Sequence, residues 1–307
     1  MMGQFHRFLR DSRGSVLIAV LMMVAIVVTL LTEFTYGVYV SSHSITYINE
    51  SQRLTPIARS GLVLSTRLLT EVGDLYNLSP AGYITMPVEK VTDQFDGSLV
   101  VTAYDENGRF NLNSLVYQNG QYNPANYEGF KRLLVYLGLQ QRIADCIVDY
   151  LDRDREERYD NAEEGSKNQY LDTIDEIYQI ACLKGSDIDT MINYVTVYGY
   201  DRRDSSVINI NSAPIPVIMT IDERITRDLA ERIVNYRNLE PFKNSTDILK
   251  VSGFEGALGQ SMLGKIAVKV RNMRIVSSAE QNGIRRIIET VVELRGRSHA
   301  VRYWREI

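Results

Sequence analysis

The chain has 307 residues, of which 45% are hydrophobic, and this is enough apolar material for two modest folding units. Its formal net charge of −4 argues against a protein built to hold the phosphate backbone of a nucleic acid. The three histidines lie far apart in the sequence, and there is no nucleophile motif of the Gly-x-Ser-x-Gly type. The sequence therefore predicts no enzyme activity.

The amino terminus carries a short basic segment followed by a long apolar run. Arg7, Arg10 and Arg13 come first, and residues 16–31 are then apolar except for Thr29. A helix over this run approaches the thickness of a bilayer if its flanks contribute. The arginines before the run predict a cytoplasmic amino terminus.

Three kinds of segment fit this pattern. A secretory signal peptide needs small residues at a cleavage site after the apolar run, and residues 36–39 fit that requirement poorly. A plain membrane anchor explains only the hydrophobicity. In the third interpretation, Gly14 ends the basic segment directly before Ser15, and this junction resembles the prepilin peptidase site. Cleavage there leaves the apolar helix on the mature protein, so we predict a leader peptide over residues 1–14.

The fifth residue of the predicted mature chain is Ala19, where major pilins carry a glutamate. A carboxylate buried in lipid needs a charged partner, and in a fibre the amino terminus of the neighbouring subunit supplies it. A subunit at the distal end has no such neighbour, so alanine at this position fits a tip subunit. Helical spacing continues farther on, and we predict a membrane and assembly helix over 15–72 with a kink or gap at Pro56.

The predicted strands fall in two separate stretches of the chain. Residues 97–104 precede an acidic turn, and Asn282-Gly283 joins two strand-like runs near the carboxyl end. The pattern between these stretches is helical. A sheet that is split in this way predicts an α+β fold with one domain inserted into another. The predicted parts are the sheet, 73–110 and 268–307, and the inserted all-α domain, 111–267.

The insertion contains two related helical patterns. Residues 143–150 and 229–236 both place apolar side chains at positions i, i+1, i+4 and i+5, which predicts two small helical modules of related design. These modules resemble SAM or helix-hairpin-helix modules. The second module resembles those of membrane-anchored DNA-uptake proteins, and DNA binding is the main alternative function. Such modules present a glycine-rich hairpin to phosphate, whereas residues 220–224 have no glycine and two carboxylates. We therefore predict packing modules that bind no nucleic acid.

An acidic loop lies inside the insertion. Residues 149–164 contain eight acidic residues and only three arginines. Carboxylates without histidine or cysteine suit a hard cation such as calcium. Counted from Asp152, the acids have EF-hand spacing, but Glu157 takes the sixth place, where the EF-hand turn needs glycine. A solvated acidic loop is the alternative interpretation.

The order of these features resembles the minor pseudopilin K family of the bacterial type II secretion system. The leader junction, the missing glutamate, the stretch 105–113 and the inserted lobe all contribute to the similarity. The resemblance implies a structural subunit that forms the tip of the pseudopilus with minor pseudopilins I and J and helps to initiate its assembly. A minor pilin of a related type IV pilus is a further alternative.

The resemblance also implies a location and a set of sites. It places the chain in the inner membrane as a single-pass protein, with a cytoplasmic amino terminus and a periplasmic carboxyl-terminal domain. The prepilin peptidase and the inner-membrane assembly platform would be its other partners. The residues that match the calcium loop of the family are Asp149, Asp152, Asp154, Glu163 and Glu164.

Two cysteines, Cys146 and Cys182, lie among apolar residues of the insertion. They allow one disulfide bond in the periplasm, because that compartment is oxidising. Two buried free thiols are the alternative interpretation.

Overall fold

The computed structural model of the chain describes residues 12–71, 75, 79, 81–88, 95–154, 156–159 and 165–307. The chain divides into two units, Met1–Leu54 and Thr55–Ile307. The long helix α1 (Ser12–Glu71) contains the apolar run, whose residues from Val16 to Leu31 are all exposed. One 18-residue window of α1 has a mean hydropathy of 2.7, so this helix is long and apolar enough to cross a membrane.

Helix α1 continues through Pro56 without the predicted gap. A proline inside a helix removes one backbone N–H and therefore one hydrogen bond, but the residues on both sides keep helical geometry here. The Ser60 hydroxyl donates a hydrogen bond of 2.8 Å to the carbonyl oxygen of Pro56. The segments of α1 before and after Pro56 therefore belong to one uninterrupted helix.

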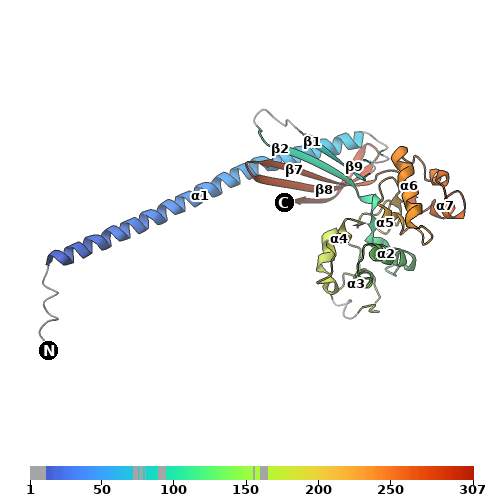
Figure 1. Cartoon of the computed structure of the whole chain (residues 1–307), viewed down its shortest axis with the longest axis horizontal. Helices are drawn as coiled ribbons and strands as arrows, with labels where there is room; N and C mark the ends of the chain where they lie inside the picture. Colours follow the sequence, from blue (N-terminus) through green and yellow to red (C-terminus); the bar gives the residue numbers. More distant parts are fainter. Residues whose placement is uncertain are drawn as a thin grey trace. The chain divides into compact units, whose positions relative to one another are not determined.

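The second unit contains a five-stranded antiparallel sheet in the order β1-β2-β7-β8-β9 (Figure 1). The strands are β1 (Tyr83–Val88), β2 (Ser98–Asp105), β7 (Asn272–Gln281), β8 (Ile284–Arg295) and β9 (Ser298–Glu306). Asn282 and Gly283 form the tight turn between β7 and β8, and both have positive φ, as the asparagine-glycine pair predicts. Strand β1 lies inside the predicted sheet segment 73–110, although no strand pattern marks Tyr83–Val88 itself.

The carboxyl-terminal part of α1 packs closely on the middle of the sheet. Ala58 and Leu62 are buried there. Gly61 allows the close approach, because a Cβ atom at this position would lie 2.9 Å from Ser277 Oγ and 3.0 Å from a methyl group of Leu99. The helix therefore covers β2 and β7, the two strands on which these contacts lie.

The helical insertion leaves the sheet after β2 and returns to it at β7 (Figure 1). Its α-helices are α2 (Pro124–Tyr136), α3 (Arg142–Leu151), α4 (Asp189–Ile192), α5 (Ile215–Ile218), α6 (Arg227–Leu239) and α7 (Ala257–Met262). Its short 3-10 helices are η2 (Glu106–Gly108), η3 (Leu112–Leu115), η4 (Ile174–Gln179), η5 (Ala181–Leu183) and η6 (Ser245–Lys250). A long helix, an antiparallel sheet and an inserted helical domain confirm the predicted α+β fold.

Two short parallel bridges show that the insertion consists of two modules of the same design. In the first, β3 (Phe110–Asn111) pairs with β4 (Val195–Thr196), and in the second, β5 (Ile208–Asn209) pairs with β6 (Ile266–Ala267). The predicted boundary assigned Phe110 to the sheet, but its strand pairs with β4, inside the insertion. The insertion therefore begins at η2, a few residues earlier than predicted.

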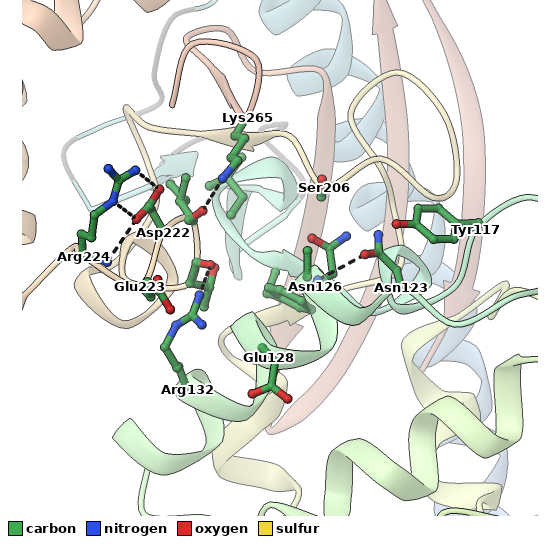
Figure 2. Close-up of a pocket in the computed structure, with 15 residues that line it drawn as sticks. Tyr117, Asn123, Asn126, Glu128, Arg132, Ser206, Asp222, Glu223, Arg224 and Lys265 are labelled. Carbon is green, nitrogen blue, oxygen red and sulfur yellow. Dashed lines mark hydrogen bonds and ion pairs between the residues drawn. The ribbon is translucent and has the colours of Figure 1, made fainter. Parts of the chain in front are cut away.

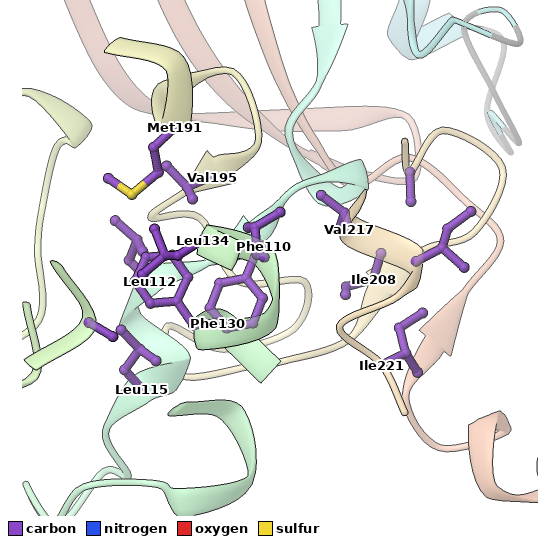
Figure 3. Packing of buried hydrophobic residues seen from close by; sticks show 14 of the residues in the cluster. Phe110, Leu112, Leu115, Phe130, Leu134, Met191, Val195, Ile208, Val217 and Ile221 are labelled. Carbon is purple, nitrogen blue, oxygen red and sulfur yellow. The ribbon is translucent and has the colours of Figure 1, made fainter. Parts of the chain in front are cut away.

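One continuous apolar core fills both modules (Figure 3). Phe110 and Phe130 stack with their ring centroids 5.3 Å apart, and both are almost fully buried. Ile208 and Val217 of the second module belong to the same cluster. The two modules therefore form one lobe rather than two independent domains.

The two cysteines meet inside the first module. Cys146 lies on α3 and Cys182 on η5, and the structure bonds them with their Cα atoms 6.0 Å apart, a separation ordinary for a disulfide. The bond links α3 to the segment that follows the acidic loop.

Candidate functional site

The joint between the sheet and the lobe is built around the buried carboxylate of Glu106. This side chain accepts hydrogen bonds from Thr196 Oγ1 at 2.6 Å and from Arg274 Nε at 3.1 Å, and it forms an ion pair of 3.2 Å with Arg109. Thr196 belongs to the lobe and Arg274 to β7 of the sheet. Burial opposes the ionisation of Glu106, but the charges of Arg109 and Arg274 outweigh it and lower its pKa.

The residues on either side of Glu106 extend this polar joint. Asn107 donates to the carbonyl oxygen of Tyr198 and accepts from the backbone N–H of Asn272 at 2.6 Å. The carboxylate of Asp105 accepts from Asn209 Nδ2 at 2.6 Å, so it reaches the second module. Burial raises the pKa of Asp105 to about 6. Three consecutive side chains thus connect the sheet to both modules.

A second contact ties the lobe to the edge of the sheet. Asp175 on η4 forms an ion pair of 2.7 Å with Arg305 on β9, and Arg305 also pairs with Glu289 on β8 at 2.9 Å. Arg274 bonds Glu289 as well, at 3.3 Å, so this chain of charges continues to Glu106. The lobe is therefore held on the sheet at two points that share one ion-pair network.

The acidic loop gathers three of the predicted metal ligands around one arginine. Arg158 Nη1 lies 2.8 Å from Asp149 Oδ1 and 2.7 Å from Asp152 Oδ2, and Nη2 lies 3.5 Å from Asp154 Oδ2. Asp149 and Asp152 are fully buried, while the side chain of Asp154 is 40% exposed. The other two predicted ligands, Glu163 and Glu164, lie outside the described residues.

The chemistry of this loop fits a hard cation, although a guanidinium takes that place in the structure. Two buried carboxylates converge on one point, and calcium prefers oxygen ligands of this kind. Asn168 follows the loop, and its buried Oδ1 has no hydrogen-bond partner among the residues that the structure describes. Among the residues that the structure describes, no group of three or more carboxylate, histidine or cysteine side chains is arranged to hold a metal ion.

In a DNA-binding hairpin, the connection over residues 220–224 would bind phosphate. Here the side chains of this connection bond to its own backbone and to each other (Figure 2). The carboxylate of Asp222 accepts hydrogen bonds from the backbone N–H of Arg224 at 3.1 Å and from its side chain at 2.8 and 2.7 Å. Arg132 and Lys265 donate to the carbonyl oxygens of Thr220 and Ile221. A neighbouring pocket of about 550 Å³ carries both signs of charge. This geometry favours packing over phosphate binding.

Some of these residues lie in stretches that the sequence singles out, but the sequence does not show what each of them contacts. The sequence predicts an acidic turn at the start of 105–113 and a family resemblance over this stretch, but nothing in the pattern distinguishes Glu106 from the other acids. Arg158 was counted as one of three arginines that oppose the acidic loop, although it is the one that contacts Asp149 and Asp152. Gly14 and Ser15, the predicted cleavage site, lie in the first residues of α1.

Comparisons with known proteins agree with this architecture. Two models of "Type II secretion system (T2SS), protein K" match residues 108–200 and 208–269, which are the two modules of the lobe. The type II secretion system protein K of Pseudomonas aeruginosa is 28% identical over 225 residues, 67% of this chain and 63% of that protein. The protein K of Dickeya chrysanthemi is 27% identical over 144 residues, 42% of this chain and 40% of that protein. Each match thus spans less than two thirds of the relative.

A solved structure has the same fold. A chain of the GspK-GspI-GspJ complex from enterotoxigenic Escherichia coli superposes with a TM-score of 0.61 at 16% identity, over 87% of this chain and 99% of that chain. A long apolar helix, an antiparallel sheet and an inserted two-module lobe define a minor pseudopilin. The chain belongs to the protein K family of the type II secretion system, a family of structural pseudopilins rather than enzymes.

Proposed function

We propose that this chain forms the tip of the pseudopilus together with minor pseudopilins I and J, acts without catalysis and helps to initiate assembly. Helix α1 anchors it in the inner membrane before assembly, with the amino terminus in the cytoplasm and the sheet and lobe in the periplasm. The similar fold occurs in a complex of GspK with GspI and GspJ, which supports these partners. The prepilin peptidase and the inner-membrane assembly platform act on it before it enters the fibre.

The observation that carries this proposal is the lobe fixed beside the sheet. Buried ion pairs of Glu106 and a more exposed pair of Asp175 hold it at two points, so it cannot swing away from the pilin-like part without breaking the buried pairs of Glu106. A lobe of this size would obstruct a repeating array of subunits, but it is compatible with a position at the end of a fibre. Ala19 in place of a glutamate fits the same position.

The partner assignment is tested by mixing the full chain in detergent with minor pseudopilins I and J. We expect one complex that contains all three chains, measured by light scattering after size-exclusion chromatography. The double variant Glu106→Ala/Asp175→Ala, which removes two of the contacts that hold the lobe on the sheet, should still associate through α1 but should cap fibres less well. Failure of the unmodified chain to form the three-chain complex would contradict the tip assignment.

Processing gives a separate prediction. Co-expression with prepilin peptidase should remove fourteen residues, because the bond between Gly14 and Ser15 precedes the apolar helix that the fibre needs. Intact-mass analysis measures the loss directly. A bulky replacement such as Gly14→Leu should leave the leader in place, whereas Gly3→Leu, inside the leader, should be cleaved normally. Retention of the leader by the unmodified chain would contradict the prediction.

We also propose that the acidic loop binds calcium. Asp149, Asp152 and Asp154 would supply ligands in the described part of the loop, and Glu163 and Glu164 would supply the others. The convergence of two fully buried carboxylates supports this proposal, because buried charges of one sign need a counter-charge. Calcium would supply positive charge and a fixed set of oxygen contacts between α3 and the segment after the loop.

Calcium removal should lower the melting temperature of the lobe. A ligand that binds only the folded form contributes RT ln(1 + [L]/Kd), about 2.7 kcal/mol when calcium is at a hundred times its Kd. Calorimetry with calcium and with chelator measures the difference, and magnesium should restore less of it. Asp154→Asn should reduce the calcium effect, whereas Glu223→Gln, an exposed acid in the second module, should leave it unchanged. Identical melting curves with calcium and with chelator would contradict the calcium proposal and favour a solvated acidic loop that binds no metal.

A further inference from the structure

Arg158 stands at the centre of the acidic loop rather than at its surface. Its Nη1 atom contacts both fully buried carboxylates, Asp149 at 2.8 Å and Asp152 at 2.7 Å. Its Nη2 atom faces Asp154 at 3.5 Å. Only 20% of the Arg158 side chain is exposed, so this is not a mobile surface arginine that pairs by chance.

Backbone and ring contacts hold Arg158 in this position. The backbone N–H groups of Arg158 and Tyr159 donate to Asp149 Oδ2 at 2.8 and 3.2 Å, which fixes the loop against the end of α3. The guanidinium carbon lies 4.7 Å from the centre of the Tyr122 ring, within the range of a cation–π contact. Tyr122 lies just before α2, so the arginine also connects the loop to another part of the first module.

The buried carboxylates require such a cation. Two ionised groups that are fully removed from water repel each other and lose their hydration, and both costs fall only when a positive charge lies between them. A guanidinium stays charged at any pH at which a protein is folded, and that of Arg158 contacts both carboxylates, so it supplies the positive charge that they need.

We propose that Arg158 is the resident cation of this loop: it closes the loop without metal and competes with calcium for the carboxylates of Asp149 and Asp152. The second half of this inference rests on the proposed calcium site. Carboxylate oxygens that hold calcium lie 2.3–2.6 Å from the ion. The carboxylates that would do so here already accept N–H groups of Arg158 at 2.7 and 2.8 Å, so a calcium ion bound to them would lie beside the guanidinium, and the repulsion between the two positive charges opposes joint occupancy.

Competition has a consequence for the loop as a whole. With calcium absent, the guanidinium keeps α3 and the loop together, so the chain can fold before it meets the ion. When calcium binds, the guanidinium must leave the two buried carboxylates, and the measured calcium affinity is lowered by the free energy of that exchange. Removing the arginine should therefore weaken the metal-free lobe and strengthen calcium binding at the same time. An arginine with a merely structural role would show only the first effect.

The test uses the full chain in detergent with Arg158→Met, Arg158→Lys and the control Arg227→Met, which removes an exposed arginine of α6. In chelator, Arg158→Met should lower the melting temperature of the lobe by about 5–10 °C, because two buried carboxylates lose their cation. Arg158→Lys should lower the melting temperature by a smaller amount, since lysine keeps a positive charge but cannot contact all three carboxylates at once. Arg227→Met should change the melting temperature by less than about 2 °C. An unchanged melting temperature in Arg158→Met would overturn the resident-cation role.

Calorimetric titration with calcium tests the competition. We expect Arg158→Met to bind calcium at least tenfold more tightly than the unmodified chain, and calcium to restore its melting temperature. If Arg158→Met is unfolded in chelator, calcium must refold it, and absence of refolding overturns the competition. Equal or weaker binding by Arg158→Met overturns it as well. If neither chain binds calcium, the calcium proposal and the competition both fail, while the melting curves in chelator still decide the resident-cation role.

Discussion

Replacing Glu106 by alanine is expected to lower the free energy of unfolding by about 3–5 kcal/mol, the usual effect of removing one partner from a buried ion pair. The Glu106 side chain is 4% exposed, and the variant would remove the carboxylate that Arg109 and Arg274 share, although Arg274 keeps its contact with Glu289. The hydroxyl of Thr196 would also lose its acceptor. Urea unfolding followed by the fluorescence of Trp304, the only tryptophan, measures the change on the sheet side of the joint.

The pH dependence of this effect has a definite sign. The pKa of Glu106 is lowered in the folded protein, so its contribution is fully present above its ordinary value of 4.5 and is lost as the pH falls below that value. The stability difference between the unmodified chain and Glu106→Gln should therefore be large at pH 7 and shrink in acid. Burial raises the pKa of Asp105 to about 6, and the charge of Glu106 adds to this in smaller part, so ionisation of Asp105 opposes folding as the pH rises. In Glu106→Gln this opposition is slightly weaker, which also makes the difference between the two proteins smaller above about pH 6 than the loss of Glu106 alone would give.

A matched substitution separates the joint from general effects of charge. Glu128→Ala removes a carboxylate of α2 whose side chain is 60% exposed and whose ion pair with Lys131 is a long contact of 3.7 Å. This variant should change the free energy of unfolding by less than about 0.5 kcal/mol. If Glu106→Ala changed the free energy of unfolding as little as Glu128→Ala, Glu106 would not hold the lobe on the sheet. The proposal that the chain forms the tip of the fibre would then lose its structural basis.

The sequence was sufficient to predict the fold class because the relevant signals are local. An apolar run, a basic flank and an asparagine-glycine turn are each visible within a few residues, and the helix and the β7–β8 hairpin lie where these signals place them. Strand β1 was missed because its pairing with β2, rather than its own composition, makes it a strand. Pro56 indicated a break, yet the helix continues, since packing on the sheet outweighs the loss of one hydrogen bond.

The joint and the acidic loop show what one sequence does not reveal. Glu106 is one acid in an acidic turn, and its partners Thr196 and Arg274 are 90 and 168 residues away. Arg158 belongs to a local cluster, but spacing alone does not tell which arginine points inward. Long-range ion pairs and the direction of a side chain depend on the folded backbone, which pattern analysis does not supply.

The repeat inside the lobe was only partly visible. The predicted similarity of 143–150 to 229–236 concerned helices, whereas the structure shows a closer correspondence in the segments before them. Asn111-Leu112-Asn113-Ser114 and Asn209-Ile210-Asn211-Ser212 follow the same pattern and start the same short parallel bridge in each module. Comparing these two tetrapeptides directly would have defined both modules from the sequence.

Within this repeat, Asn113→Ala and Asn211→Ala are each expected to lower the free energy of unfolding by at least about 2 kcal/mol. Asn113 accepts from the backbone N–H of Leu171 and donates to the carbonyl oxygens of Leu171 and Val197, at 2.7–2.9 Å. Alanine would take these bonds from the N–H of Leu171 and the carbonyl oxygen of Val197, at about 1–3 kcal/mol for each, while the carbonyl oxygen of Leu171 keeps its bond from Arg203. Asn211 makes the equivalent bonds to Phe242 and Val268. Calorimetry of the lobe transition measures both losses.

The pattern of loss tests how the modules depend on each other. Because one apolar core runs through both, we expect each variant to lower the same single transition, and hydrogen exchange to show Leu171 and Phe242 losing protection together. Asn113→Asp should be as harmful as alanine, since it keeps the acceptor but turns a donor into an oxygen that faces two carbonyl groups. Asn238→Ala, an exposed asparagine on α6, should change stability by less than about 0.5 kcal/mol. Two separate transitions in either buried variant would show instead that each module is stable alone, and that the shared core contributes little to the lobe.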